Sequence, residues 1–593
     1  MNLQTLTLAL ALAAASPLTA AAPATDPTGA GAESTRLHLL FERSWDDSAR
    51  RSPEWATFRG DRRFDHRFSD ASPEAAAAAD AAVHAELAAA RAIRREQLPP
   101  ADQLSLDLFV DRAERQVAMM AFDGWRRQSI SSAFGFQSRL AGLLQAMPID
   151  TPARGEQVLA RLAAWPARLA QEIERVRGAV AQGWVPARPV LERALAQLDA
   201  QLAAPVRTGP YFQPLRDMSP TLPADLQAAL RSRGEAAITA LVLPAQRSLR
   251  AFIADEMLPR APAAGGLAHY PGGEALDAAL VRERTTTTLS PAEVHAIGLR
   301  EMARLRGEFT RVQQAMRFEG SFTQFVAHLN GPQYFYASPE AMLTGYRALA
   351  KRLDPEMPAL FAELPRLPYG IRPMPAFLGA GAADSYNGPP GDGSGPGWYN
   401  ANTQAFQRRP RWALPTLVAH ETAPGHHLQI ARARELGDLP DFRRLGGYTA
   451  FSEGWALYAE TLGDRFGLYD APEDRFGHLQ AQAFRAARLV VDTGLHAMGW
   501  SRQRAIDYMV QEVGESPVFI ESEVDRYLSN PAQALAYMIG KLKFDELRDR
   551  AQLRLGARFD LRRFHNAVLD AGALPLNLLE RRIDDWIVAQ PQG

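Results

Sequence analysis

The spacing of apolar and polar residues predicts a chain built mainly from helices. Residues from about 35 to 280 contain long amphipathic runs rich in Ala, Leu, Arg and Gln, and this pattern is typical of helices. Helix starts are marked by Ser72-Pro73-Glu74, Ser290-Pro291-Ala292-Glu293 and Ser338-Pro339-Glu340. Ser before a helix with Pro at its first position is a typical start signal. We therefore predict a mainly α fold, in which the first half serves as scaffold and cleft wall.

The pattern changes between Tyr369 and Thr403, where short strands and a Gly/Pro-rich segment are expected. Residues 388–397 are interpreted either as a surface connection or as a lid beside a cleft. The following WYNANT is predicted to be an edge strand that pairs with an extended peptide, with Tyr399 and Asn400 binding substrate. The alternative is a buried strand whose aromatic rings only pack.

A new helix is predicted from Leu414 to Glu435, and it contains HETAPGHH. In the zinc pattern H-E-x-x-H, two histidines one turn apart face one ion and the glutamate lies alongside. Here Pro424 and Gly425 interrupt that spacing, and a bulge in the helix is the expected outcome. A bulge that absorbs two residues would make His426 the second metal ligand after His420, while His427 stays an alternative.

The third ligand is expected from the next helix, in FSEGWALYAE, where Glu453 follows His426 by 27 residues. Two histidines and one glutamate leave one position open for water, as in catalytic zinc sites. Glu460 is either a rival carboxylate ligand or a partner that orients an imidazole. The plain alternative is a helix end with chance histidines, but 3 of the chain's 12 histidines fall within eight residues here, which favours a metal site.

Composition limits the remaining possibilities. The 593 residues are 47% hydrophobic and 22% charged with a net charge of -1, which predicts a globular protein of more than one domain and neither a nucleic-acid nor a membrane partner. Cysteine is absent, which excludes disulfides, thiolate ligands, a Cys nucleophile and a lipobox-type anchor. Residues 1–22 are predicted to be a signal peptide for export to the periplasm or outside the cell, with a frayed apolar N-terminus as the alternative.

The C-terminal third supplies polar candidates for the remaining roles. Stabilisation of a developing oxyanion requires donors, and substrate carboxylates require cations. Three residues are predicted to act in catalysis: His496, which has Asp492 one turn before it, Tyr527 and Tyr537. Two cations, Arg526 and Lys541, are predicted to bind substrate. Core packing for the tyrosines and solvated ion pairs for the charged residues are the alternatives.

HETAPGHH followed by SEGWALYAE resembles the bacterial family known as domain of unknown function 885, which is similar to zinc metallopeptidases of the glutamate-zincin type. Ser-Glu-Gly-Trp-Ala-Leu-Tyr resembles the Glu-ligand helix of aminopeptidase N-like enzymes. Gly425-His426 is similar to the Gly-His of thimet oligopeptidase and carboxypeptidase Taq, and the stretched motif is similar to that of dipeptidyl peptidase III. The resemblance implies two lobes, residues 23–280 and a catalytic lobe over 281–593, with a small sheet beside the metal helix and residues 526–541 facing the metal.

The expected function is zinc-dependent hydrolysis of amide bonds in short peptides, with one Zn²⁺ per chain and Glu421 as general base. A metal-dependent amidase or esterase acting on a non-peptide substrate is one alternative, because the ligands activate water without selecting the carbonyl. A metallopeptidase-like binding protein without turnover is another. Glu421 favours an enzyme, since a binding protein has no need of a base beside the ligand. The sequence indicates no oligomeric state.

Overall fold

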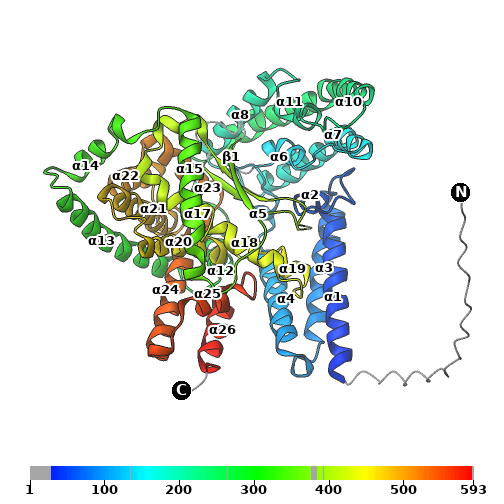
Figure 1. Cartoon of the computed structure of the whole chain (residues 1–593). Helices are drawn as coiled ribbons and strands as arrows, with labels where there is room; N and C mark the ends of the chain where they lie inside the picture. Colours follow the sequence, from blue (N-terminus) through cyan, green and yellow to red (C-terminus); the bar gives the residue numbers. More distant parts are fainter. Residues whose placement is uncertain (1–28, 134, 264, 375–382, 392, 591–593) are drawn as a thin grey trace, which may run out of the picture.

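The structure is a computed structural model that describes residues 29–133, 135–263, 265–374, 383–391 and 393–590. Helices make up most of these residues, and the described part contains one sheet of three strands (Figure 1). The predicted mainly helical class is therefore confirmed. The predicted signal segment, residues 1–22, lies outside the described residues. Among those residues, no helix has the length and apolar character needed to span a bilayer.

Three helices begin where the Ser-Pro signals predict. The capping serines and their helices are Ser72 for α3 (Pro73–Arg91), Ser290 for α13 (Pro291–Ala315) and Ser338 for α15 (Pro339–Leu353). At α13 the cap is reciprocal, because Glu293 N–H donates to the Ser290 hydroxyl and Ser290 N–H donates to the Glu293 carboxylate. Each cap satisfies backbone donors that the first helical turn leaves open.

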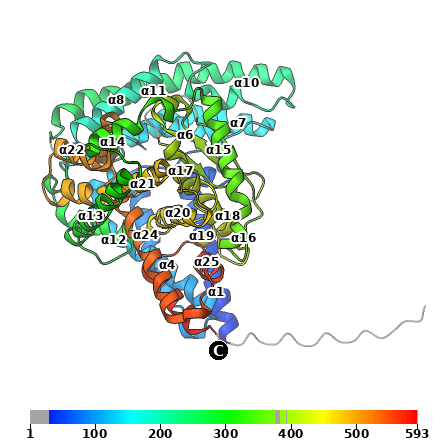
Figure 2. The same ribbon diagram turned by 60° about the vertical axis from the view of Figure 1, so that its left-hand side comes forward.

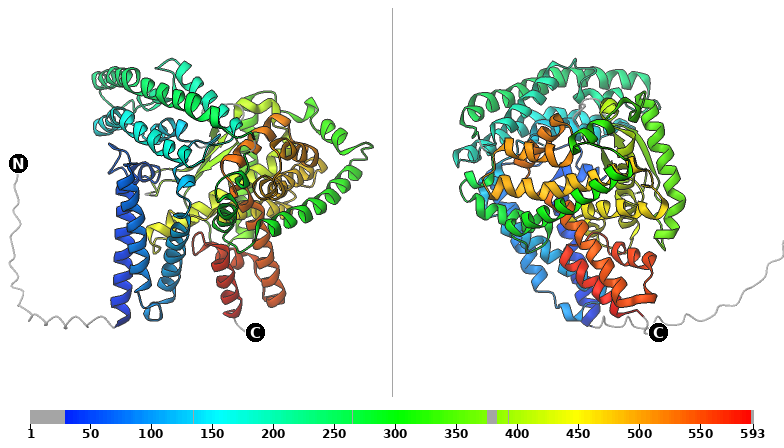
Figure 3. Two further views of the ribbon diagram at one scale, coloured as in Figure 1. Left: turned by 180° about the vertical axis from the view of Figure 1, so that it is seen from behind. Right: turned by 90° about the vertical axis from the view of Figure 1, so that its left-hand side faces the viewer.

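The N-terminal helices lie side by side at one end of the molecule (Figures 1 and 3). They are α1 (Gly29–Arg51), α3 and α4 (Pro100–Met119). Their buried residues belong to the same hydrophobic core as most of the second half of the chain. Phe41, for example, packs against Phe442 with ring centroids 4.8 Å apart. The first helices therefore support the C-terminal half directly.

Most buried hydrophobic residues between Ile130 and Met257 form a second core. Its main helices are α7 (Pro152–Ala181), α8 (Arg188–Ala203), α10 (Ala224–Ala237) and α11 (Leu243–Ala251). Trp165 and Phe136 stack within it, with ring centroids 5.2 Å apart. Trp184 and Val190 of the same stretch pack in the first core, and the domain boundary predicted near residue 280 stays a prediction.

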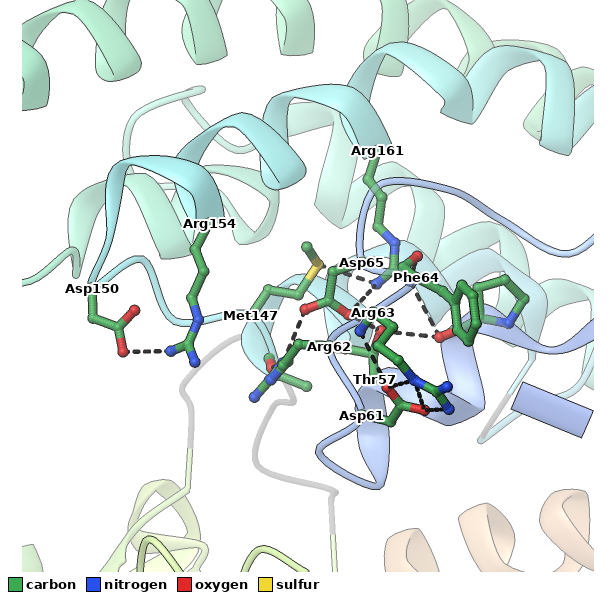
Figure 4. A network of polar contacts seen from close by, with 12 residues as sticks. Thr57, Asp61, Arg62, Arg63, Phe64, Asp65, Met147, Asp150, Arg154 and Arg161 are labelled. Carbon is green, nitrogen blue, oxygen red and sulfur yellow. Dashed lines mark hydrogen bonds and ion pairs between the residues drawn. The ribbon is translucent and has the colours of Figure 1, made fainter. Parts of the chain in front are cut away.

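A buried arginine joins these two parts of the chain (Figure 4). Arg161 of α7 is fully buried, and its guanidinium donates to the backbone oxygens of Pro53, Phe64 and Arg67 at 3.1 to 3.3 Å. A planar guanidinium can serve several carbonyls at once. The segment from Pro53 to Arg67 is thereby held against α7.

The C-terminal half is built around α20 (Thr449–Thr461) and α21 (Pro472–Ala497). In Figure 2, α20 lies in the interior of this half. It packs closely against α24 (Ala536–Leu555), and a Cβ added at Gly454 would lie 2.5 Å from the Gly540 Cα. The two glycines therefore allow the backbones of α20 and α24 to touch.

The sheet contains β1 (Tyr369–Pro373), β2 (Ser385–Asn387) and β3 (Gly397–Ala401) in the order β1-β3-β2. β3 pairs in parallel with β1 and antiparallel with β2. The prediction that the WYNANT segment is an edge strand is therefore wrong, because β3 is central and both of its sides are already hydrogen-bonded. The described part of the Gly/Pro-rich segment connects β2 to β3, and its possible role as a lid stays a prediction.

Candidate metal centre

The segment predicted to form one metal-binding helix forms two helices. α17 (Leu414–Glu421) and α18 (His426–Glu435) are separated by a turn at residues 422–425. The single bulged helix expected over 414–435 is therefore wrong. Pro424 has no N–H to continue the helical hydrogen bonds, and the chain ends one helix and begins another instead of widening a turn.

Gly425 and Trp455 determine the shape of this turn. A Cβ at Gly425 would overlap with the backbone oxygen of His420, so glycine is needed for the two helix ends to approach. Trp455 of α20 donates its indole N–H to the Pro424 oxygen at 3.0 Å. The turn thus brings the first residue of α18 beside the last turn of α17.

His420, His426 and Glu453 converge at this point. One possible ligand atom from each residue lies within 4.8 Å of the other two. Glu453 Oε2 is 3.2 Å from His426 Nε2 and 3.7 Å from His420 Nε2. Ligand atoms at about 2.1 Å from a tetrahedral zinc ion are about 3.4 Å from one another. The three side chains therefore fit around one small cation.

Two buried carboxylate oxygens at this cluster lack a hydrogen bond of good geometry: Glu421 Oε2, and Glu453 Oε2, whose nearest contact is the His426 imidazole at 3.2 Å. A buried polar atom left unsatisfied costs about 1–3 kcal/mol, and more when it is charged. Burial acts to raise the pKa of Glu453, but the two imidazoles hold that pKa well below its usual range. An anionic Glu453 with an unsatisfied oxygen is suited to a cation.

Glu460 fixes the orientation of His420. Its Oε1 lies 2.7 Å from His420 Nδ1, and its Oε2 accepts a hydrogen bond from Thr416 at 2.7 Å. His420 Nε2 therefore points toward Glu453 and His426. Although burial acts to lower it, the neighbouring Glu453 and Glu460 raise the pKa of His420 to about 9. Of the two roles expected for Glu460, the geometry matches the one that orients an imidazole.

His427 faces away from the cluster. Its Nδ1 lies 2.8 Å from the Tyr386 hydroxyl, and its ring packs on Tyr369 with centroids 4.5 Å apart. Burial lowers the pKa of His427 to about 4. Of the two histidines considered as second ligand, the turn directs His426 toward the cluster and His427 toward the sheet.

Glu421 lies next to the three converging residues and is 6% exposed. Burial raises the pKa of Glu421, whereas the positive charges of His426 and His420 act to lower it. A buried carboxylate whose pKa is raised is better able to accept a proton from water than an ordinary one. This is the arrangement expected of a general base.

Tyr537 approaches the cluster from α24. It lies one turn before Gly540, where α24 touches α20, and Glu453 directly precedes the facing Gly454. Burial raises the pKa of Tyr537 to about 12, and the charge of Glu453 contributes to this increase. Tyr537 is also half-buried rather than fully enclosed. Its hydroxyl is therefore a candidate donor to a bound substrate.

His496 is placed elsewhere, and the catalytic role expected for it is wrong. Its Nδ1 accepts from Leu267 N–H and its Nε2 donates to the Tyr527 oxygen, each at 3.1 Å. Burial lowers the pKa of His496 to about 4. Asp492, expected to orient this ring, instead accepts from Ala532 N–H at 3.1 Å. Both ring nitrogens thus form hydrogen bonds with backbone groups.

The catalytic role expected for Tyr527 is also wrong. Tyr527 is fully buried. Its hydroxyl donates to Glu523 at 2.9 Å and accepts from Arg488 at 3.0 Å. The alternative of core packing with a satisfied hydroxyl describes this residue.

Neither cation proposed to bind substrate is free to do so. Arg526 donates to Glu523 at 2.8 Å and to Gln533 at 2.6 Å. Lys541 is 7% exposed and forms an ion pair with Asp545 at 2.6 Å. Both side chains are committed within the protein, which contradicts their predicted role.

The predicted substrate strand is likewise internal. The Tyr399 hydroxyl donates to Asp384 at 2.7 Å, and the ring is fully buried. Asn400 accepts from Arg372 Nε at 2.8 Å. These contacts contradict the substrate-binding role expected for Tyr399 and Asn400, since their side chains already hold the sheet together.

Two residues beside the centre had no predicted role. Trp455 supports the turn, and Tyr386 bonds to His427. Trp455 lies inside the SEGWALYAE motif, so its indole donor could have been assigned from the motif. Tyr386 lies in a short strand without a distinctive pattern, and only the fold brings it to α18.

The fold and the cluster define a mainly helical protein with a partly buried group of two histidines and one glutamate. Residues 53–583 match the family described as "Bacterial protein of unknown function (DUF885)", and the chain belongs to this family. It is similar to a crystal structure from Colwellia psychrerythraea, described as a "putative lipoprotein", with 28% identity and a TM-score of 0.90 over 94% of this chain and 100% of that one. A Shewanella oneidensis lipoprotein structure of unknown function shares the fold at 19% identity, with a TM-score of 0.71 over 92% and 99% of the two chains. No curated protein matches the chain.

Proposed function

We propose that this protein is a zinc-dependent hydrolase of amide bonds in short peptides. The observation that carries the proposal is the convergence of His420, His426 and Glu453, with the unpartnered Glu421 carboxylate beside them. Two histidines and one glutamate are typical ligands of catalytic zinc, which keeps a further position for water or substrate. The resemblance of the motifs to zinc metallopeptidases supports the same activity.

Different residues of the chain would have different roles in the proposed hydrolysis. His420, His426 and Glu453 would hold the ion, which when bound supplies Lewis acidity toward a carbonyl and a water molecule. Glu421 takes a proton from the attacking water and passes it to the leaving amine nitrogen. Tyr537 donates its hydroxyl to the carbonyl oxygen as negative charge develops there.

We also propose that the protein is exported. The apolar N-terminal segment is typical of a signal peptide, and the similar Colwellia protein is described as a lipoprotein. A substrate pool of short peptides in the periplasm or outside the cell would be consistent with the proposed chemistry.

The proposal is tested by measuring bound zinc and peptide hydrolysis on the same purified samples. We expect one zinc per chain in the wild type, and a peptide-library digest that releases new termini. Glu421→Gln should retain zinc and lose about 10²- to 10⁴-fold in rate, the usual contribution of a general base. Equal hydrolysis by the two proteins would overturn the role of Glu421, and the absence of any metal-dependent digestion would overturn the function.

A matched pair of variants tests the ligand assignment. His426→Ala should lose zinc, because its Nε2 faces Glu453. His427→Ala, the neighbouring residue, should keep zinc, because its ring faces Tyr386 and Tyr369. Loss of zinc in His427→Ala but not in His426→Ala would mean that His427 is the second ligand.

A further inference from the structure

A cavity of about 350 Å³ lies between the N-terminal helices and the C-terminal half. One wall comes from α1 and α2 (Pro53–Phe58), and the other from α19 (Asp441–Arg444). The lining includes Trp45, Arg59 and Gly391. It also includes Arg63 and Arg444, each paired with a lining carboxylate, Asp61 and Asp441. The cavity is large enough for a small part of a ligand.

Arg59 has no partner for its charge. Its side chain makes no hydrogen bond or ion pair with any described residue, and its guanidinium lies over the Trp45 ring at 4.5 Å. Burial lowers the pKa of Arg59, and the nearby positive charge of Arg112 lowers it further. Arg112 also lacks a hydrogen bond or a carboxylate within 4 Å in the described ranges. Of these two arginines, Arg59 lines the cavity, and its guanidinium has no carboxylate within 4 Å in the described ranges.

The other two arginines of the cavity wall are paired with carboxylates. Arg63 donates to Asp61 at 2.7 Å and to Asp46 at 2.6 Å, and Figure 4 shows it folded onto Asp61. Arg444 forms an ion pair with Asp441 at 2.5 Å. Unlike Arg63 and Arg444, Arg59 has no carboxylate partner among the described residues.

Arg434 connects this cavity to the metal centre. It lies near the end of α18, and its Nε is buried without a hydrogen-bond partner among the described residues. A Cβ at Gly391, which lines the cavity, would be 3.5 Å from Arg434 Nη1. Tyr386 of β2 bonds to His427, the neighbour of His426, and a Cβ at Gly388, just after β2, would be 3.5 Å from Arg434 Nη2. The same short segment thus contacts both Arg434 and the residue beside His426.

We infer that these side chains form a carboxylate-binding subsite for the peptide substrate, here called the arginine pocket (Trp45, Arg59 and Arg434). This inference rests on the proposed peptidase function. Guanidinium groups bind carboxylates through paired, charge-assisted hydrogen bonds.

The carboxylate could be the C-terminus of the peptide or an acidic side chain, and four peptides of equal length distinguish them. They combine a C-terminal acid or amide with an internal Asp or Asn. Binding is measured by fluorescence anisotropy to Glu421→Gln, which does not consume the peptide. We expect one of the two carboxylates to strengthen binding at least about tenfold, as charge-assisted hydrogen bonds to arginine do, and this preference should weaken with added salt.

Arginine variants then test which side chains produce the preference for a carboxylate. Arg59→Met and Arg434→Met should each reduce it to less than about threefold, because each removes a guanidinium that has no internal partner. The matched control is Arg432→Met, on the same helix, since Arg432 already donates to Asp570 at 2.9 Å. Thermal melting of each variant checks that it is folded. Equal binding of all four peptides, or a preference that survives both substitutions, would overturn the arginine pocket.

Digestion of the same peptides by the wild type separates this inference from the proposed function. A carboxylate preference without any hydrolysis would overturn the peptidase and leave an anion-binding pocket. Hydrolysis at equal rates for all four peptides would overturn the pocket and leave the peptidase.

Discussion

Glu460 Oε1 lies 2.7 Å from Nδ1 of His420, and both side chains are buried. This contact makes Nδ1 the hydrogen-bonded nitrogen of the ring and leaves Nε2 to face Glu453. A carboxylate behind a metal-binding histidine is a common means of holding the ring in place and increasing its basicity. The candidate metal centre therefore contains two carboxylates of α20, one within the cluster and one behind it.

Glu460→Gln should weaken zinc binding about 10- to 100-fold, because an amide holds the imidazole less strongly than a carboxylate does. Competition with a coloured chelator measures the affinity. Glu172→Gln is the matched control: Glu172 is a fully buried, arginine-paired glutamate of α7 in the other core, and its loss should leave zinc affinity unchanged. Equal affinities for wild type and Glu460→Gln would contradict the positioning role.

Gly425→Ala should destabilise the protein by about 1–3 kcal/mol, the usual cost of overpacking, and should reduce zinc content. The added methyl group would overlap with the His420 backbone oxygen and push α17 and α18 apart. Urea unfolding and metal analysis measure the two effects. Gly437→Ala, in the loop after α18 where a Cβ meets nothing within 4 Å, should change neither, and similar behaviour of both variants would argue against the tight turn.

Tyr537→Phe should lower kcat about 100-fold with little change in KM, as expected when one donor to an oxyanion is removed. Steady-state kinetics on a peptide substrate measures this effect. Tyr527→Phe is the comparison, because its hydroxyl contacts Glu523 and Arg488 rather than the centre. That variant should lose about 1–3 kcal/mol of stability and keep kcat. A normal kcat for Tyr537→Phe would show that the hydroxyl of this tyrosine does not stabilise the oxyanion.

Asp277→Asn should make stability less dependent on pH. Burial raises the pKa of Asp277 from 3.8 to about 7, and neither carboxylate oxygen has a hydrogen-bond partner among the described residues. Because the folded state holds this proton more tightly than the unfolded chain, the free energy of unfolding falls as the pH rises from about 4 to about 7. The loss is on the order of 1 to 4 kcal/mol, at 1.4 kcal/mol per pKa unit.

Urea unfolding at pH 4, 6 and 8 measures this effect. Asp277→Asn should be more stable than the wild type at pH 8 and equal to it near pH 4. Asp438→Asn, in an exposed loop, should follow the wild-type curve. Parallel curves for the wild type and Asp277→Asn would mean that the folded protein does not hold this proton.

Local signals allowed part of the fold to be predicted correctly. The helix starts at Ser72, Ser290 and Ser338 depend on hydrogen bonds within four residues, so the local sequence contains all the information needed. The position of Glu453 on a helix is similarly local. The WYNANT segment was misassigned because strand order depends on which segments pair, and β1 and β2 are both needed to make β3 central.

The sequence by itself determined the chemical types available at the centre: two imidazoles, a carboxylate ligand, a neighbouring base, and a proline that ends the helix. Only the tertiary structure decided which histidine joins the cluster, because Gly425 and the Trp455 indole set the path of the turn through contacts with distant residues. It also decided that His496, Tyr527, Arg526 and Lys541 are internal supports. The partners of His496, Leu267 and Tyr527, come from distant elements. The carboxylates paired with Arg526 and Lys541 lie on the same helices as these cations, but the burial of both pairs depends on what packs against those helices.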